Sequence, residues 1–123
     1  MINKDFRYAV VGASNNEEKY GYKVFNDLIE GWYKVIAINP NEKEILWTKV
    51  YPTLSDYVGI IDVVIFVVPP QVTEKILEEV KTLGIKNVRM QPGAESPTAI
   101  KFCEENGIAC THDACIMIQR KVK

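Results

Sequence analysis

The chain has 123 residues, which predicts a single domain over residues 1–123, and its 15 basic and 16 acidic residues leave a net charge of −1, which argues against sequence-independent binding to nucleic acid. Its three cysteines are odd in number and lack a CxxC spacing, and it has one histidine, so neither a disulfide framework nor a metal site is expected. No apolar run approaches the roughly 20 residues that span a bilayer, and the N-terminus lacks signal-peptide character, so we expect a cytoplasmic protein without membrane contact.

The first elements predicted along the chain are a strand, a tight turn and a helix. Tyr8–Val11 is a short apolar run that ends in a turn of small residues, and residues 19–30 have the spacing of an amphipathic helix. Gly31 is expected to end this helix. The positions predicted to face the core are Val24, Leu28 and Ile29.

The next segment contains one clear strand and one irregular stretch. Lys34–Ile38 is predicted to be the second strand. Residues 41–59 are less regular, and we expect them to hold a short strand near Val50 and a helical turn over Leu54–Tyr57.

The most apolar segment is Asp62–Val68. Both of its faces are apolar, as in a parallel strand that is covered by helices on both sides. A helix is predicted after it, ending at Gly84. The residues at helical spacing are Val72, Ile76, Leu77, Val80 and Leu83.

The last third of the chain repeats the alternation of strand and helix. Asn87–Met90 and Ile108–Thr111 are predicted strands, and between them Ser96 has the character of an N-cap, followed by a proline at the first helical position. Gly107 is expected to stop that helix, and its inward positions are Ala99, Ile100 and Cys103. The whole pattern predicts an α/β fold: a doubly wound, mainly parallel sheet in a three-layer, single domain.

In such sheets ligands bind beyond the carboxyl ends of the strands, so the residues that follow each strand are the candidates for a site. Turn geometry alone explains single glycines and prolines in these loops, but their coincidence at one edge favours a binding site. The segments are Gly12-Ala13-Ser14, Asn39-Pro40, Val68-Pro69-Pro70, Gln91-Pro92-Gly93-Ala94 and His112-Asp113-Ala114-Cys115.

The turn after the first strand has features of a phosphate site, because backbone N–H groups and a helix N-terminus meet there. Gly12 is one glycine of the three in G-x-G-x-x-G, and Asn39 stands where NAD enzymes usually have an acid, so an ordinary NAD site is not expected. Ser14 can bind phosphate or cap the helix. Lys19 and Lys23, four residues apart, can reach a phosphate or be solvated surface lysines.

These loops, in this order, resemble those of the CoA-binding domain family of small bacterial and archaeal proteins. The resemblance extends from about Arg7 to Met117, and the Gln-Pro-Gly-Ala segment followed by Asp-x-Cys-Ile is its most specific part. The family is similar to the Rossmann-like N-terminal domain of the succinyl-CoA synthetase α-subunit, standing alone. The segments that carry it are Val11–Ser14, Lys19–Lys23, Gly31–Val35, Asn39-Pro40, Val68–Pro70, Met90–Glu95 and His112–Met117.

The resemblance implies coenzyme A as the ligand and a place for each group of loop residues. Gly12, Ala13 and Ser14 would meet the phosphates, with Lys19 and Lys23 beside them. Asn39 and Pro40 would border the nucleotide, Val68, Pro69 and Pro70 would form a wall for the adenine, and Gln91, Pro92, Gly93 and Ala94 would face the pantetheine. Two departures are Lys19, where many relatives carry arginine, and the acids Glu17 and Glu18, which have to point away from the phosphates.

No catalytic residue is predicted, because the synthetase's phosphohistidine lies in a second domain and His112 has no evident acid or base partner. The favoured function is binding of coenzyme A or an acyl-CoA without chemistry. The alternative is a detached part of an NDP-forming acyl-CoA synthetase that needs a partner chain, and an NAD-linked redox protein is the least favoured.

Two expectations concern single residues. Gly12→Val is expected to block the ligand while leaving the fold mostly intact. Cys115 is expected to be the thiol that exchanges with CoA disulfide, because Cys103 and Cys110 have the positions of core residues.

Overall fold

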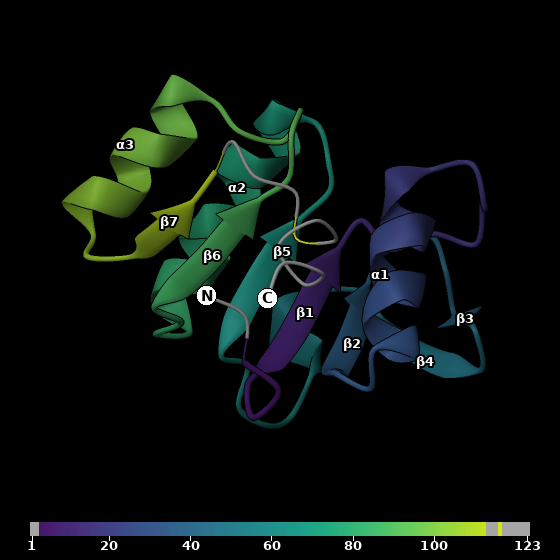
Figure 1. The fold of residues 1–123 in the computed structure, drawn as a ribbon. Coiled ribbons are helices and arrows are strands. Elements are labelled where there is room, and N and C mark those ends of the chain that lie inside the picture. Colours follow the sequence, from purple (N-terminus) through teal and green to yellow (C-terminus); the bar gives the residue numbers. More distant parts are fainter. Residues whose placement is uncertain (1–2, 113–115, 117–123) are drawn as a thin grey trace.

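The structure is a computed structural model that describes residues 3–112 and residue 116. Figure 1 shows a twisted sheet with α1 in front of it and α2 behind it. Among the described residues the strand order is β3-β4-β2-β1-β5-β6-β7, and every pairing is parallel except that of β3 with β4. The elements are β1 (Arg7–Val11), α1 (Tyr20–Glu30), β2 (Lys34–Ile38), β3 (Glu44–Ile45), β4 (Thr48–Tyr51), the 3-10 turn η1 (Leu54–Asp56), β5 (Val63–Phe66), α2 (Pro70–Thr82), β6 (Asn87–Met90), α3 (Pro97–Glu105) and β7 (Ala109–Thr111).

Two apolar clusters, one on each face of the sheet, give the three layers that the sequence predicts. Successive strand residues point to opposite faces, so Tyr8 and Val10 join one cluster while Ala9 and Val11 join the other. The cluster that contains Tyr8 and Val10 includes Val24, Phe25 and Leu28 of α1. The cluster that contains Ala9 and Val11 includes two residues of α2 and two of α3, which are Leu77, Val80, Ala99 and Cys103.

Most predicted elements are confirmed, and several of them differ from the predicted bounds by one or two residues. Ser96 caps α3 as expected, since its hydroxyl accepts a hydrogen bond from the Ala99 N–H at 3.0 Å. The helix α1 begins at Tyr20, one residue later than predicted, because Lys19 has the extended backbone of an N-cap. The strand β5 ends at Phe66, which leaves Val67 and Val68 in the loop that follows it.

A two-residue strand, β3, was not predicted. It forms a hairpin with β4 through Leu46 and Trp47, whose φ angles are 49° and 64°. A hairpin turn with this left-handed geometry normally carries Asn-Gly. Here Leu46 and Trp47 occupy it, so the sequence gives no signal of a turn at these residues.

Ile29 and Cys110, which were predicted to be buried, are half-buried. Val72 and Leu83, which share the helical spacing of the α2 region, are 37% and 43% exposed. Gly31 ends α1 as predicted, but the left-handed residue there is Trp32, at φ 63°. None of the described helices is both long enough and apolar enough to cross a membrane.

Candidate binding cleft

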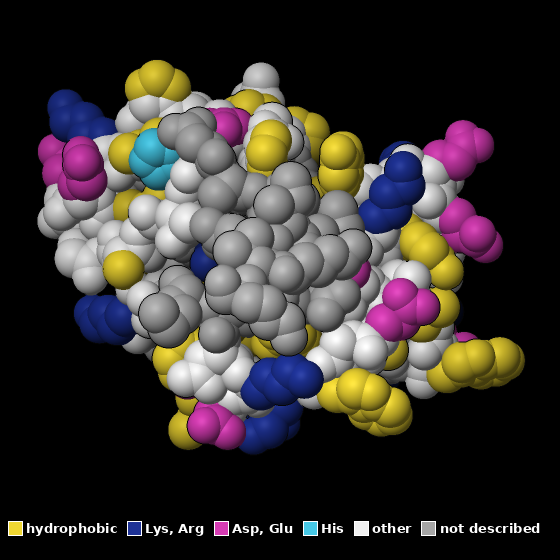
Figure 2. Space-filling view, viewed as in Figure 1, with side chains coloured by type: hydrophobic (Ala, Val, Ile, Leu, Met, Phe, Trp, Pro, Cys, Tyr) yellow, Lys and Arg dark blue, Asp and Glu magenta, His cyan; other side chains and the backbone are white. Residues whose placement is uncertain are grey.

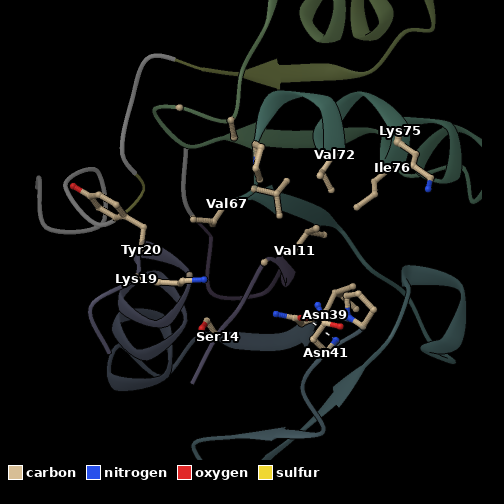
Figure 3. A pocket seen from close by; sticks show the side chains of 18 of the residues that line it. Val11, Ser14, Lys19, Tyr20, Asn39, Asn41, Val67, Val72, Lys75 and Ile76 are labelled. Carbon is tan, nitrogen blue, oxygen red and sulfur yellow. Dashed lines mark hydrogen bonds between the residues drawn. The ribbon is translucent and has the colours of Figure 1, made fainter. Parts of the chain in front are cut away.

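A cleft of about 1130 Å³ opens at the carboxyl edge of the sheet, where β1, β2, β5 and β6 end. This is the switch point of the fold, because β2 and β5 leave β1 on opposite sides. Pockets that bind drug-sized ligands measure roughly 300–1,000 Å³, so the cleft has room for a ligand as large as a dinucleotide. Figure 3 shows its walls, with Val11 and Val67 at the base and α2 along one side.

Most of the residues predicted from the strand-end loops line this cleft. Three predicted residues do not: Ala13 is fully buried beneath the turn, Lys23 lies on the exposed side of α1 near the Tyr20 ring, and Gln91 is 2% exposed. Those that line it are Gly12, Ser14, Lys19, Asn39, Pro40, Val68, Pro69, Pro70, Pro92, Gly93 and Ala94.

Gly12 is required by the protein's own backbone. Its φ is +99°, and a Cβ placed on it would lie 2.3 Å from the carbonyl oxygen of Val67 in the β5–α2 loop. The expectation that Gly12→Val leaves the fold mostly intact is therefore wrong. A branched side chain would separate two loops of the cleft whether or not a ligand is present.

Gly21 also lines the cleft and was not predicted from the sequence. A Cβ on it would lie 1.9 Å from the carbonyl oxygen of Gly12, so α1 can approach the turn after β1 only because residue 21 has no side chain. This is the packing role of the third glycine in the dinucleotide fingerprint, reached here after a longer loop. The signal in the sequence was a glycine in the first turn of a helix, where it lowers helix propensity.

The loop between β1 and α1 is held by hydrogen bonds within the loop and to Glu42 in the loop between β2 and β3. The Ser14 hydroxyl accepts a hydrogen bond from the Asn16 N–H at 3.0 Å, so it stabilises a local turn and does not cap α1. The Asn15 N–H and side-chain amide donate to the two carboxylate oxygens of Glu42 at 2.8 and 2.9 Å. These hydrogen bonds lower the pKa of Glu42 below its usual value.

Asn39 connects two loops of the cleft. Its side-chain amide donates to the Ala13 carbonyl at 2.7 Å. Its side-chain oxygen accepts from the Asn41 N–H at 2.8 Å (Figure 3). An aspartate cannot make the first of these hydrogen bonds, because a carboxylate has no hydrogen to donate. The amide at this position is therefore explained by the fold as well as by the absence of an NAD-type acid.

Asn39→Asp is expected to destabilise the protein by about 1–3 kcal/mol at neutral pH, because the part-buried Ala13 carbonyl loses its donor. Protonation restores a donor, so the introduced carboxyl has a raised pKa in the folded state and the variant should recover stability as the pH falls. Urea unfolding of the variant between pH 4 and 8 measures this. Asn41→Asp, which adds the same charge at an exposed position, is the control and should show no such recovery.

Two lysines stand at opposite ends of the cleft (Figure 3). Lys19 extends toward the turn after β1, and Lys75 of α2 lies at the far end beyond Val72 and Ile76. The N-terminal ends of α1 and α2 also face the cleft and add partial positive charge. Glu18 lines it too, so the expectation that both neighbouring acids point away does not hold for Glu18.

The remaining candidates lie around the last strand. The buried Gln91 side chain accepts a hydrogen bond from the Ile116 N–H at 3.1 Å and so ties the end of β6 to the C-terminal region. His112 follows β7, and Asp113, Ala114 and Cys115 lie outside the described residues. Across residues 3–112 and 116, no three His, Cys, Asp or Glu side chains gather in a way that could hold a metal ion.

Of the two described thiols, Cys103 is buried in the core and Cys110 is half-buried beside it. Cys103 is fully buried, as predicted, and its contact with the Cys110 thiol, together with burial, raises its pKa. The Cys110 sulfur lies 3.9 Å from the Met90 sulfur, on the side of the sheet covered by α3.

Comparison with known proteins finds a family and several similar structures. A family model described as CoA binding domain matches residues 7–121. A conserved hypothetical protein from Pyrococcus furiosus has a similar structure, with a TM-score of 0.89 and 37% identity, over 93% of this chain and 98% of its own.

Enzyme subunits are also similar to part of this chain. The α-subunit of an ADP-forming acetate–CoA ligase II from Pyrococcus furiosus is 38% identical over 81 residues, which is 65% of this chain and 18% of the subunit. A dinucleotide-forming acetyl-coenzyme A synthetase 1 from Ca. Korarchaeum cryptofilum, solved with phosphate and ADP, has a TM-score of 0.74 and 25% identity, over 85% of this chain and 25% of its own. This chain therefore spans a quarter or less of the length of these enzymes.

Proposed function

The chain belongs to the CoA-binding domain family, and on that premise we propose that the cleft binds coenzyme A or an acyl-CoA. The observation that carries the proposal is the cleft itself: a glycine turn, two helix N-termini and Lys19 meet at one end of a groove whose walls are apolar. Coenzyme A combines a pyrophosphate and a 3′-phosphate with an adenine ring and a long pantetheine arm. A groove with charge at its ends and apolar walls between them matches that chemistry.

The pyrophosphate is assigned to the turn formed by Gly12 and Ser14. Backbone N–H groups at the start of a helix bind phosphate well, because the first four are not used within the helix. Lys19 adds a full positive charge beside that turn. Ala13 and Lys23 are given no direct contact with the ligand in this proposal, since neither lines the cleft.

The apolar walls are assigned to the adenine and the pantetheine. Val68, Pro69 and Pro70 lie at the start of α2, and Val72 and Ile76 continue the same wall along that helix. Asn39 and Pro40 face them across the cleft at the end of β2. The loop of Pro92, Gly93 and Ala94 after β6 is the third side and would receive the pantetheine arm.

The proposed role is binding without chemistry. Among the described residues that line the cleft, the acids are Glu18 and Glu79, and Glu79 is engaged by the Ser55 N–H at 3.1 Å and the Ser55 hydroxyl at 2.5 Å. Neither acid forms a pair with a histidine or a second carboxylate in the cleft, so no acid–base or nucleophile arrangement is proposed.

A second candidate is a detached part of an acyl-CoA synthetase. The similarity to the acetate–CoA ligase subunit favours it, because the matched region is a small part of a larger enzyme. In that case the chain would supply the CoA site and a partner chain would supply the reaction. Co-purification of the tagged chain, with and without added coenzyme A, separates the two candidates by the presence of a stoichiometric partner.

Calorimetric titration with coenzyme A, NAD and NADP tests the ligand class. Coenzyme A is expected to bind, and NAD is expected to bind at least tenfold more weakly, because the site has one fingerprint glycine in the turn and an amide at Asn39. Native mass spectrometry of the purified protein is the companion measurement. Tighter binding of NAD than of coenzyme A would contradict the proposal.

A further inference from the structure

The large hydrophobic side chains that are exposed in the described part of the chain are unevenly distributed. Tyr20 and Val72 lie at the cleft, whereas the others precede β2, β4, β5 or β6, at the edge where the parallel strands begin. This amino edge is opposite the cleft. Its exposed members are Trp32 (85%), Trp47 (92%), Val58 (94%), Ile60 (76%) and Leu83 (43%).

Both tryptophans of the chain are on this edge, and both have left-handed backbone, at φ 63° for Trp32 and 64° for Trp47. Bulky residues rarely adopt this conformation, so it points to a role for the side chain. Leu46, the other residue of the β3–β4 turn, is half-buried and packs against the core. Trp47 has no such role within its own chain, since it is almost fully exposed.

Exposed hydrophobic side chains are visible on the surface of the molecule (Figure 2). In Figure 2, drawn in the orientation of Figure 1, hydrophobic side chains stand out at the lower right, beside the C-terminal end of α1 and the β3–β4 hairpin. The indole ring is the largest apolar group available to an interface, and tryptophan is enriched at the centres of protein interfaces.

The same edge has a hollow of about 240 Å³. It lies between the loop that leads into β5 and the turn that leads from α2 into β6, and its volume is comparable to that of one large aromatic side chain. Its apolar side chains are Leu54, Tyr57, Ile60, Ile61, Leu83 and Ile85. More than half of its accessible lining is polar and includes the backbone of Gly59 and Gly84, so the indole N–H of an incoming tryptophan can find a hydrogen-bond partner there.

We propose that the amino edge binds a second copy of this chain, with Trp47 of each copy seated in the hollow of the other. Each chain carries both the Trp47 side chain and the hollow. A two-fold axis therefore places each Trp47 in the hollow of the other copy, so that the same surface is used on both copies, as an isologous interface requires. The spacing is compatible with this arrangement. From β4 to β6 there are four strand intervals, about 19 Å in all, which is within the footprint of one interface.

The exposed apolar side chains account for most of the area that a dimer interface of ordinary size buries. Two tryptophans offer roughly 300–500 Å² per copy, because each aromatic side chain buries about 150–250 Å². A standard interface buries about 800 Å² per partner. Val58, Ile60 and Leu83, with the loop between the first two, supply a large part of the remainder. The cleft stays open in this dimer, since it lies at the other edge of the sheet.

Sedimentation velocity over a range of concentrations tests the proposal. The chain is expected to show a monomer–dimer equilibrium, and Trp47→Gly should raise the dimer dissociation constant at least tenfold. Glycine adopts the left-handed conformation without strain, so the variant should fold and melt at a temperature no lower than that of the parent. Tyr20→Ala, which removes an exposed ring at the cleft edge, is the control and should leave the dissociation constant unchanged.

Ile60→Asp tests the hollow from the other side and should also weaken the dimer at least tenfold. The side chain is mostly exposed, so the charge does not enter the core. A chain that is monomeric at its highest attainable concentration would overturn the proposal. So would a dimer that both variants leave intact, or a monomer whose Trp47 becomes buried only in a complex with a different protein. Titration with coenzyme A gives a separate readout, because Trp47→Gly should not change its affinity.

Discussion

Gly21→Ala is expected to destabilise the protein by about 3 kcal/mol, at the upper end of the cost of overpacking. The added Cβ would lie 1.9 Å from the Gly12 carbonyl oxygen, so α1 has to move away from the turn after β1. The turn cannot yield easily, because the Gly12 N–H donates to the Ile38 carbonyl at 3.0 Å and a Val67 carbonyl lies on its other side. Helix propensity alone predicts the opposite sign, since alanine is favoured over glycine by about 1 kcal/mol.

Urea unfolding followed by circular dichroism measures this change. Gly84→Ala is the matched control: a Cβ there meets nothing within 4 Å, so only its left-handed φ of +75° contributes, at about 1 kcal/mol. The two variants should also differ in CoA binding. Displacement of α1 disturbs the turn that lines the cleft, whereas Gly84 is at the opposite edge. A Gly21→Ala protein as stable as the parent would show that the close approach is absent.

Lys19→Ala is expected to weaken CoA binding by about 1.5–3 kcal/mol, the contribution of a hydrogen bond to a charged group, which is roughly a 10- to 150-fold change in affinity. Lys19 lines the cleft beside the turn proposed for the pyrophosphate, so the loss should be the same with dephospho-CoA. Lys23→Ala is the matched control. It removes the same charge four residues later on a surface outside the cleft, and it should change the affinity less than twofold.

Calorimetric titration at two salt concentrations gives the readout, since contacts between charges weaken as ionic strength rises. Lys75→Ala extends the experiment to the far end of the cleft. A larger loss for CoA than for dephospho-CoA in that variant would place the 3′-phosphate near Lys75. Equal effects of Lys19→Ala and Lys23→Ala would contradict the assignment of the pyrophosphate to the turn.

The different positions of Lys19 and Lys23 show a limit of prediction from residue spacing. A spacing of four predicts one helix face only if both residues are helical. Lys19 is the N-cap of α1, with an extended backbone, so its side chain leaves the helix axis in a direction that helical periodicity does not describe. The start of the helix decides which of the two lysines lines the cleft, and helix boundaries are the least certain part of any prediction from a pattern.

The part of α2 that lines the cleft was also not predictable from the sequence pattern. The residues Val72 and Ile76 share one helical spacing with Leu77 and Val80, so the sequence pattern does not separate the two pairs. The structure rotates α2 so that Leu77 and Val80 are buried while these two line the cleft. Periodicity defines a stripe on a helix but not the angle at which that stripe meets the sheet, so the division between core and site depends on packing.

The sequence by itself determined the α/β alternation, the bounds of β2 and β6, the cap of α3 and the edge of the sheet at which the cleft opens, because these follow from local periodicity and turn chemistry. The tertiary structure alone decided the β3–β4 hairpin, the contact between Gly21 and Gly12, and the exposure of Trp47 on the edge away from the cleft. Each of these depends on how close two segments approach one another. That distance is set by the packing of the whole domain, and no window of neighbouring residues contains it.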